Sequence, residues 1–280
     1  MQKKWKTVIK SKSGMFDFKL KEIWKYRDLC YTFIRKNYVT RYKQTILGPL
    51  YMVLSPLLTS GIFTVVFGTI AGIETDGIPQ FLFYMSGNLV WGFFSNCVTE
   101  NSNIFGTNAY IMGKVYFPRL VIPLANTLTK LIDLTIQFLM FIIFFFIFQF
   151  RGYTFEPNLW LLAVPFVLLM ISAAGFGIGL ICSSLTIKYR DLNVFLGFGM
   201  KLLMYVTPVI YPLSKLTYPW DQIMLINPVA CAIEVFRYSF FSVGTIPIWS
   251  LIWSMVLTLA LCMIGLILFN KVEKTFIDTI

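Results

Sequence analysis

Few residues of this chain have the types and spacing that catalysis or nucleotide binding requires. A P-loop needs the pattern G-x-x-x-x-G-K-[ST]; in the nearest segment, residues 106–115, six residues separate the two glycines and Val115 takes the hydroxyl position. The sequence has no histidine, which excludes histidine-based acid–base catalysis and histidine-ligated metals. Glu74 and Asp76 form a close acidic pair that a solvated turn explains. We therefore predict that the chain is not an enzyme and binds no cofactor.

The composition places the chain in a lipid bilayer. Hydrophobic residues make up 57% of the 280 positions and charged residues only 13%, a charged share about half that of a soluble domain. Residues 1–49 hold thirteen basic and three acidic side chains, whereas the other 231 residues hold eleven and ten. The basic excess therefore belongs to one N-terminal tail beside a membrane, where anionic lipids, and not nucleic acid, are the expected partner.

Six apolar runs are long enough to cross the roughly 30 Å hydrocarbon core as helices. They are Leu50–Ala71, Phe81–Val98, Leu134–Phe150, Leu159–Cys182, Val194–Tyr211 and Ile248–Phe269. The third can begin as early as Leu120, and Lys130 and Asp133 would then pair at i, i+3 on one helical face. The chain is thus predicted to be an all-α integral membrane protein with six transmembrane helices.

The distribution of basic residues predicts the orientation of these spans. Twenty Lys and Arg residues lie in the N-terminal tail, the second and fourth loops and the C-terminal tail, against three on the opposite side. Because basic loops stay in the cytoplasm, both termini are expected there. The chain then divides into a cytoplasmic tail (1–49), a membrane domain (50–270) and a short cytoplasmic tail (271–280).

Two segments outside the spans are also predicted to associate with the membrane. Residues 16–46 carry apolar side chains at helical spacing opposite charged ones, which indicates an amphipathic helix in the interface plane, interrupted near Asp28, which could cap a second helix. A simple positive-inside anchor is the alternative. Residues 212–247 are too apolar for a solvated loop, and their prolines favour short helices between turns. We interpret this region as an external re-entrant helical hairpin between spans five and six, with an amphipathic external loop as the alternative.

Three features of the spans suggest contacts. Gly175, Gly177 and Gly179 form a small-residue stripe that permits close helix contact. The 28 phenylalanines suit lipid contact, although aromatic rings that stack on sugar faces could also line a glycan pore. Lys201 is the one charge within the six runs, and a charge at a lipid-facing helix centre costs about 2.5–3.5 kcal/mol. It is expected to face protein or a wet cavity, or else to extend toward the cytoplasmic headgroups.

Several short strings occur in one order along the chain. The first span is preceded by Arg27-Asp28-Leu29 and by RYKQTILGP at 41–49, and it contains Pro56. The later strings are Ser86-Gly87 with Trp91 and Phe94, KVYFPR at 114–119, Tyr189-Arg190-Asp191, TPVIYP at 207–212 and Asn227-Pro228. Together they resemble the transmembrane subunits of bacterial polysaccharide ABC exporters, the type-two exporter family, over roughly residues 20–270. Tyr51, where the family has Trp, and Lys201 depart from it.

The resemblance implies a half-transporter that forms a homodimer and pairs with two copies of a separate ATPase subunit. Its expected cargo is a lipid-linked polysaccharide of the O-antigen kind, exported across the bacterial cytoplasmic (inner) membrane. Teichoic acid, capsule and a small lipid or drug are the alternative cargoes. An ATP-independent channel or carrier is less expected, because the six runs contain no acidic residue for a carboxylate relay.

The resemblance also implies roles for particular residues. The string in or near the helix that couples to the ATPase comprises Lys114, Val115, Tyr116, Phe117, Pro118 and Arg119, with Tyr189, Arg190 and Asp191 as a second contact. The external hairpin would be a gate, with Pro208, Tyr211, Pro212, Trp220 and Pro228 as its candidate residues.

Two further sets follow from the chemistry of an anionic lipid-linked glycan. Where the interfacial helix meets the first span, basic side chains could hold a pyrophosphate headgroup by charge-assisted hydrogen bonds: Arg35, Lys36, Arg41 and Lys43. The resemblance to a dimeric exporter implies that the first and fifth spans meet across the two-fold axis, so the candidate channel-lining residues are Phe63, Phe67, Phe198, Lys201 and Tyr205.

Overall fold

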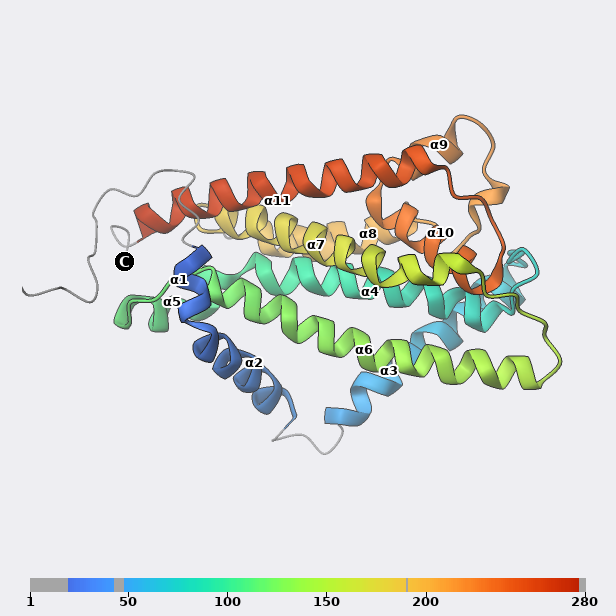
Figure 1. The fold of residues 1–280 in the computed structure, drawn as a ribbon, viewed down its shortest axis with the longest axis horizontal. Coiled ribbons are helices and arrows are strands. Elements are labelled where there is room, and N and C mark those ends of the chain that lie inside the picture. The colour runs from blue at the N-terminus through green and yellow to red at the C-terminus, as the bar shows by residue number, and fades with distance from the viewer. Residues whose placement is uncertain (1–19, 43–47, 190, 277–280) are drawn as a thin grey trace, which may run out of the picture.

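The computed structural model describes residues 20–42, 48–189 and 191–276, and every regular element within these ranges is a helix (Figure 1). Four long helices lie side by side along the molecule, each in contact with the next, in the order α6, α4, α7, α11. Their bounds are Val121–Phe150, Gln80–Ser102, Val164–Thr186 and Ile248–Phe276. The predicted all-α class is confirmed for the described residues.

The N-terminal region forms two helices at one end of the molecule, α1 (Leu20–Lys25) and α2 (Arg27–Tyr42). The break falls at Tyr26, next to the predicted interruption of the apolar stripe. Helix α2 packs on α6, and its Phe33 is buried. The predicted segment 16–46 is therefore helical where it is described, and its residues 16–19 and 43–47 lie outside the described chain.

Four helical segments in the described chain are long and apolar enough to cross a membrane. They are Leu50–Ile70, Val121–Phe150, Leu159–Thr186 and Ile248–Glu273. The first joins α3 (Gly48–Phe63) to a π-helical turn, η1 (Thr64–Ile70), and the third joins a 3₁₀ turn, η2 (Leu159–Ala163), to α7. Helix α4 is long enough but less apolar, because it carries polar residues such as Asn88 and Asn101.

Two predicted spans have different limits in the structure. Helix α6 starts at Val121, the early alternative, and so contains Lys130 and Asp133. Helix α8 covers only Leu192–Tyr205, about 21 Å at 1.5 Å per residue, and the predicted continuation to Tyr211 is wrong. Pro208 explains the early end, because proline disfavours helical geometry in the residue before it.

Residues 212–247 form short helices between turns, as predicted: η3 (Leu213–Lys215), α9 (Trp220–Leu225) and α10 (Pro228–Phe241). The Asn227-Pro228 pair starts α10 in the expected manner, since the Asn227 side chain accepts from the Val229 N–H at 3.0 Å and proline occupies the first turn. These helices lie at the end of the molecule opposite α1 and α5 (Ile104–Lys114) (Figure 1).

Glycines let α7 approach both of its neighbours. A Cβ placed on Gly175 or Gly179 would lie 2.7 Å from Cys97 Cβ or 2.5 Å from Asn101 Cβ in α4. On another face, a Cβ on Gly177 would lie 2.8 Å from the backbone nitrogen of Cys262 in α11. The predicted close contact is confirmed, and it matters in lipid, where packing rather than water exclusion drives helix association.

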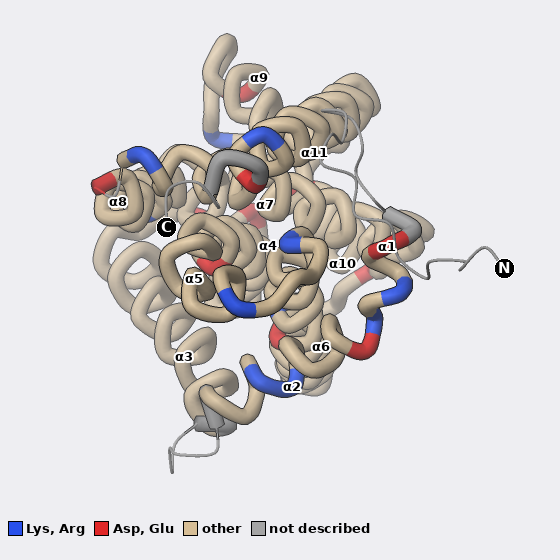
Figure 2. The backbone as a smooth tube through the Cα atoms, turned by 90° about the vertical axis from the view of Figure 1, so that its left-hand side faces the viewer, with Lys and Arg blue, Asp and Glu red and all other residues tan. Residues whose placement is uncertain are grey.

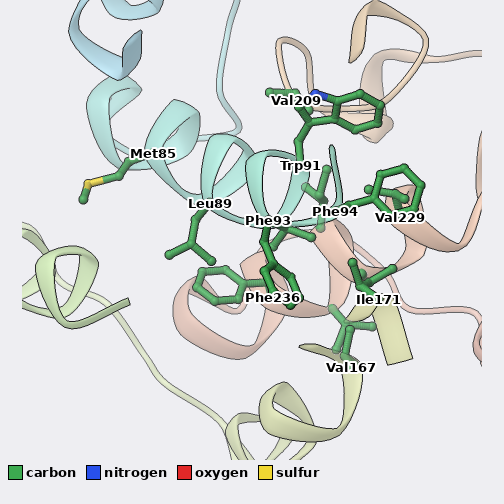
Figure 3. Packing of buried hydrophobic residues seen from close by; sticks show 14 of the residues in the cluster. Met85, Leu89, Trp91, Phe93, Phe94, Val167, Ile171, Val209, Val229 and Phe236 are labelled. Carbon is green, nitrogen blue, oxygen red and sulfur yellow. The ribbon is translucent and has the colours of Figure 1, made fainter. Parts of the chain in front are cut away.

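The largest buried cluster joins α4, α6, α7, α10 and the turn after α8. Figure 3 shows residues from these elements in contact around α4, including Trp91, Phe94, Ile171, Val209 and Phe236. A second cluster lies near α5 and joins α2, the loop before α6 and the end of α11. The two clusters fix the two ends of the molecule on which the candidate sites lie.

Candidate functional site

The segment that follows α5 has an exposed half and an anchored half. Val115 and Tyr116 are exposed, whereas Phe117, Pro118 and Arg119 are buried. Arg119 Nη1 donates to the Glu273 carbonyl at 2.8 Å, near the C-terminus of α11, where the helix dipole favours a cation. Burial lowers the pKa of Arg119. The predicted coupling string is thus attached to α11 through Arg119, while Val115 and Tyr116 are exposed to solvent.

The second predicted contact lies at the same end. Thr186 Oγ1, at the end of α7, donates to the Ser102 carbonyl at the end of α4 at 2.9 Å, and Tyr189 follows as an exposed residue. Asp191 is exposed, and Arg190 lies outside the described residues. Figure 2 views this end and shows Lys and Arg positions around it. The two strings therefore lie at the same end of the molecule, where Figure 2 shows both basic and acidic positions.

A buried charge cluster fixes α2 to the membrane helices. Lys130 is 5% exposed, and its Nζ lies 3.0 Å from Glu100 Oε1 of α4 and 3.7 Å from Asp133 Oδ2, which confirms the predicted i, i+3 pair. Tyr38 Oη of α2 donates to Asp133 Oδ1 at 3.1 Å. The sequence analysis missed Glu100 and Tyr38 because their contacts join segments far apart in the chain.

The structure describes the predicted headgroup residues only in part. Arg35 and Lys36 are exposed on α2, with Lys36 Nζ 5.7 Å from the centre of the Phe33 ring. Arg41 lies in the last turn of α2, and Lys43 lies outside the described residues. Arg35 and Lys36 are thus accessible on a helix that packs on α6.

The predicted channel residues form two separate groups. Phe63 and Phe67 are half-buried, meet edge to face at 5.3 Å between ring centres, and both approach Tyr84 of α4. Phe198 and Tyr205, by contrast, are 59% and 55% exposed on α8, on which Lys201 is also exposed. In the described part of this single chain, no ring contact joins the two groups. A common wall would require a second copy.

At the opposite end, Arg237 of α10 holds the turn after α8 against α4. Its Nη1 donates to the Pro208 carbonyl at 2.6 Å, and its Nη2 donates to those of Val209 and Phe83 at 3.1 and 3.2 Å. Its Nε donates to Ser86 Oγ at 3.3 Å, and the guanidinium carbon lies 3.5 Å from the centre of the Phe83 ring. One buried side chain thus joins three elements.

These contacts give a structural role to two of the strings on which the resemblance is based, Ser86-Gly87 and TPVIYP at 207–212. Ser86 accepts from Arg237, and Gly87 leaves space for it, since a Cβ there would lie 2.9 Å from Arg237 Nη2. Glu234 partly balances the charge, with its Oε1 3.7 Å from Arg237 Nη1. The sequence analysis counted Arg237 only as an external charge. The spacing E-x-x-R within an apolar helix was the signal that could have identified this pair.

The predicted gate residues surround this junction. Pro208, Pro212 and Pro228 are buried, Tyr211 is half-buried, and Trp220 is 59% exposed at the start of α9. The Tyr211 hydroxyl donates to the Tyr205 carbonyl at 3.3 Å, which joins the turn to the end of α8. Four of the five residues are therefore packed between the turn after α8 and the start of α10, and Trp220 lies on the surface.

The acidic pair Glu74 and Asp76 contacts η3. Asp76 accepts from Ser214 Oγ at 2.8 and 2.7 Å through its two oxygens, and Glu74 forms an ion pair with Lys215. The Lys215 ammonium lowers the pKa of Glu74, and Glu74 raises the pKa of Lys215. The turn is exposed, as predicted, but it also joins the end of η1 to η3.

Comparison with known proteins identifies the family. The profile of the ABC-2 type transporter family matches residues 28–241 of this chain. The chain belongs to the ABC-2 type transporter family. Two proteins of Klebsiella pneumoniae, each described as O-antigen export system permease protein RfbA, are 29% identical to it over 253 residues, 90% of this chain and 94% of theirs. A Myxococcus xanthus protein of the same description is 25% identical over 198 residues, 70% of this chain and 73% of its own.

Family membership makes this chain a transporter component of the inner membrane with several spans, in agreement with its long apolar helices. The matched region of the ABC-2 transporter runs from the first turn of α2 to the last residue of α10. It therefore includes the coupling strings, the charge cluster around Lys130 and the Arg237 junction.

Proposed function

We propose that this chain is the transmembrane subunit of an exporter that moves a lipid-linked polysaccharide of the O-antigen kind out of the cytoplasm, with energy from a separate ATPase. The observation that carries the proposal is the similarity to O-antigen export permeases over 90% of the chain. The sequence supports it because the nearest approach to a P-loop has the wrong spacing and lacks the hydroxyl residue.

In this proposal the chain crosses the membrane six times, with both termini in the cytoplasm. α4 and α8 add two crossings to the four apolar segments, and α9 and α10 form the external re-entrant hairpin. The short α8 needs the turn held by Arg237 to reach the far interface. The end of the molecule that carries Tyr116 and Tyr189 then faces the cytoplasm, in keeping with the positive-inside count of the sequence.

A homodimer with two ATPase subunits accounts for the exposed apolar faces. Only 6% of the residues in the most apolar 18-residue stretch of the first span are buried within one chain. In α8, Met200 is the one buried residue. If α3 and α8 of two copies form the channel, the exposed rings of Phe198 and Tyr205 face sugars, with Phe63 and Phe67 behind or beside them. Rings suit a sliding polymer because stacking guides it without one deep site.

Entry of the substrate and coupling are assigned to the cytoplasmic end. Arg35, Lys36, Arg41 and Lys43 hold the anionic headgroup next to the first span. Tyr116, Val115 and Tyr189 contact the ATPase through their exposed edges, while Phe117 and Arg119 transmit the movement to α2 and α11. The hairpin residues Pro208 to Pro228 form the external gate.

Deletion and complementation in the source bacterium test the function. Without the chain, surface glycan should be lost and lipid-linked glycan should accumulate inside; unchanged surface glycan would refute the proposal.

Complementation with Tyr116→Ala should yield a membrane complex with about tenfold or greater loss of export, since an interface aromatic is removed. The matched control is Tyr153→Ala, an exposed tyrosine at the opposite end, which should restore export. Equal export by both variants would remove Tyr116 from the coupling contact.

A further inference from the structure

A cavity of about 350 Å³ lies between α9, α10 and the start of α11, and Glu234, the ion-pair partner of Arg237, is one of its lining residues. Its walls come from η3, α9, α10 and the loop that precedes α11. These elements lie at the end of the molecule opposite α5 (Figure 1). The volume is within the roughly 300–1,000 Å³ range of small-molecule sites.

Two residues that line the cavity, Asp221 and Glu234, each have one buried carboxylate oxygen without a hydrogen-bond donor in the described chain. Glu234 is 6% exposed, and its Oε1 has only the ion-pair contact at 3.7 Å with Arg237 Nη1. The Arg237 donors are directed at backbone carbonyls and Ser86 instead. Asp221 Oδ1, from α9, is likewise buried and unpartnered. An ionised carboxylate only accepts hydrogen bonds, so a ligand that fits here must donate them.

The rest of the wall narrows the class of ligand. Gln222 and Thr245 offer both donors and acceptors, and Trp249 with several leucines supplies an apolar side. A phosphate or an acidic sugar would meet two carboxylates and be repelled. In the described chain no group of three or more metal-ligating side chains occurs, so the lining does not suit a metal ion. An ammonium group would duplicate Arg237, whose Nη1 already lies 3.7 Å from Glu234 Oε1 and compensates its charge.

We propose that this cavity binds one neutral sugar ring of the exported glycan, with its hydroxyls donating to Asp221 and Glu234 and its C–H face against Trp249. A pyranose presents hydroxyls at its edge and apolar C–H groups on its faces, which matches the two kinds of wall. The proposal rests on the proposed function, since export supplies the glycan. It separates two recognition tasks: the cytoplasmic end binds the lipid headgroup, and the acidic cavity at the hairpin end binds sugar.

Binding can be measured without transport, by saturation-transfer NMR on the complete permease–ATPase complex in nanodiscs. The probes are methyl glycosides of common neutral hexoses and short oligosaccharides released by mild acid from the strain's own surface glycan. We expect contact signals for at least one oligosaccharide. Asp221→Asn and Trp249→Leu should each weaken binding about tenfold, because one charged acceptor or the stacking surface is lost. The matched control, Glu156→Gln, changes an exposed carboxylate outside the cavity and should bind normally.

Each outcome has a defined meaning. Glu234→Gln could unfold the junction with Arg237, so Asp221→Asn and Trp249→Leu carry the test. If a complex that exports glycan gives no signal with any oligosaccharide, or binds equally well in all variants, the sugar assignment is wrong and the proposed function stands. Binding of ethanolamine alone, abolished by Asp221→Asn, would reassign the cavity to a lipid ammonium headgroup and overturn the inference. Failure of export in the deletion experiment refutes the proposed function separately.

Discussion

Helices α4 and α8 were both predicted as spans, yet one lies in the centre of the molecule and the other lies on its surface. Most residues of α4 are buried, including polar ones such as Ser86 and Asn101, whereas Met200 is the one buried residue of α8. The more polar helix is thus the better packed one. In a bilayer, apolar side chains are equally satisfied by lipid, so small and polar residues mark the inner helix.

The first prediction tests whether small residues define the packed region. Gly177→Val should abolish folded protein, because its side chain would meet the backbone of α11, which cannot move aside as a flexible side chain would. We expect a loss of about 3 kcal/mol or more. Gly199→Val on α8 is the matched control, since no atom lies within 4 Å of a Cβ there, and it should change stability by about 1 kcal/mol or less. Thermal unfolding in detergent, followed by size-exclusion chromatography, measures both.

If the two valine variants were equally stable, close packing of α7 on α11 would not be a requirement of the fold. The distinction between packed and surface helices would then lose its physical basis.

The second prediction compares a buried cation with an exposed one. Arg237→Met leaves the Glu234 carboxylate without charge compensation and three backbone carbonyls without their donor, so a loss of about 3–5 kcal/mol is expected. Lys201→Met on α8 should change stability by about 0.5 kcal/mol or less, because Lys201 is exposed. Urea or thermal unfolding of the two purified variants gives the comparison.

The double variant Glu234→Gln/Arg237→Met refines this result. Removing both charges should recover part of the stability lost in Arg237→Met, because no unpaired carboxylate remains. A double variant as unstable as Arg237→Met would show that the lost carbonyl contacts, and not the charge, dominate the effect.

The sequence predicted most of the helices because hydrophobic length and prolines are local signals. The break at Tyr26, the Asn227-Pro228 start of α10 and the glycine stripe of α7 follow from neighbouring residues alone. The extension of α6 to Val121 was open, since Lys130 and Asp133 are unfavourable in lipid unless a partner neutralises them. That partner, Glu100, comes from another helix, and no local pattern indicates it.

The candidate sites show the same limit. The coupling string was predicted, but not that Phe117 and Arg119 anchor it while Tyr116 stays exposed. Arg237 was counted as a loop charge because its acceptors, the carbonyls of Phe83 and Pro208, are far away in sequence and belong to the backbone. Backbone carbonyls have no sequence signature, so a site built from them becomes visible only in the folded chain.

The last prediction has the smallest effect on stability and asks what covers α8. Single cysteines at Phe198 and Tyr205, in a background without the native five, should leave folding nearly unchanged because both side chains are exposed. If α8 lines a water-filled channel in the dimer, these cysteines should react with a membrane-impermeant thiol reagent when nucleotide holds the transporter open. Cysteines at Leu139 and Ile143, equally exposed on α6, are the matched controls and should react only with lipid-soluble reagents.

The four side chains are about equally exposed in one chain, so a difference in reactivity between the two pairs can come only from what surrounds them in the dimer, water or lipid. Equal labelling of both pairs by lipid-soluble reagents alone, in every nucleotide state, would place α8 against lipid and remove Phe198 and Tyr205 from the channel.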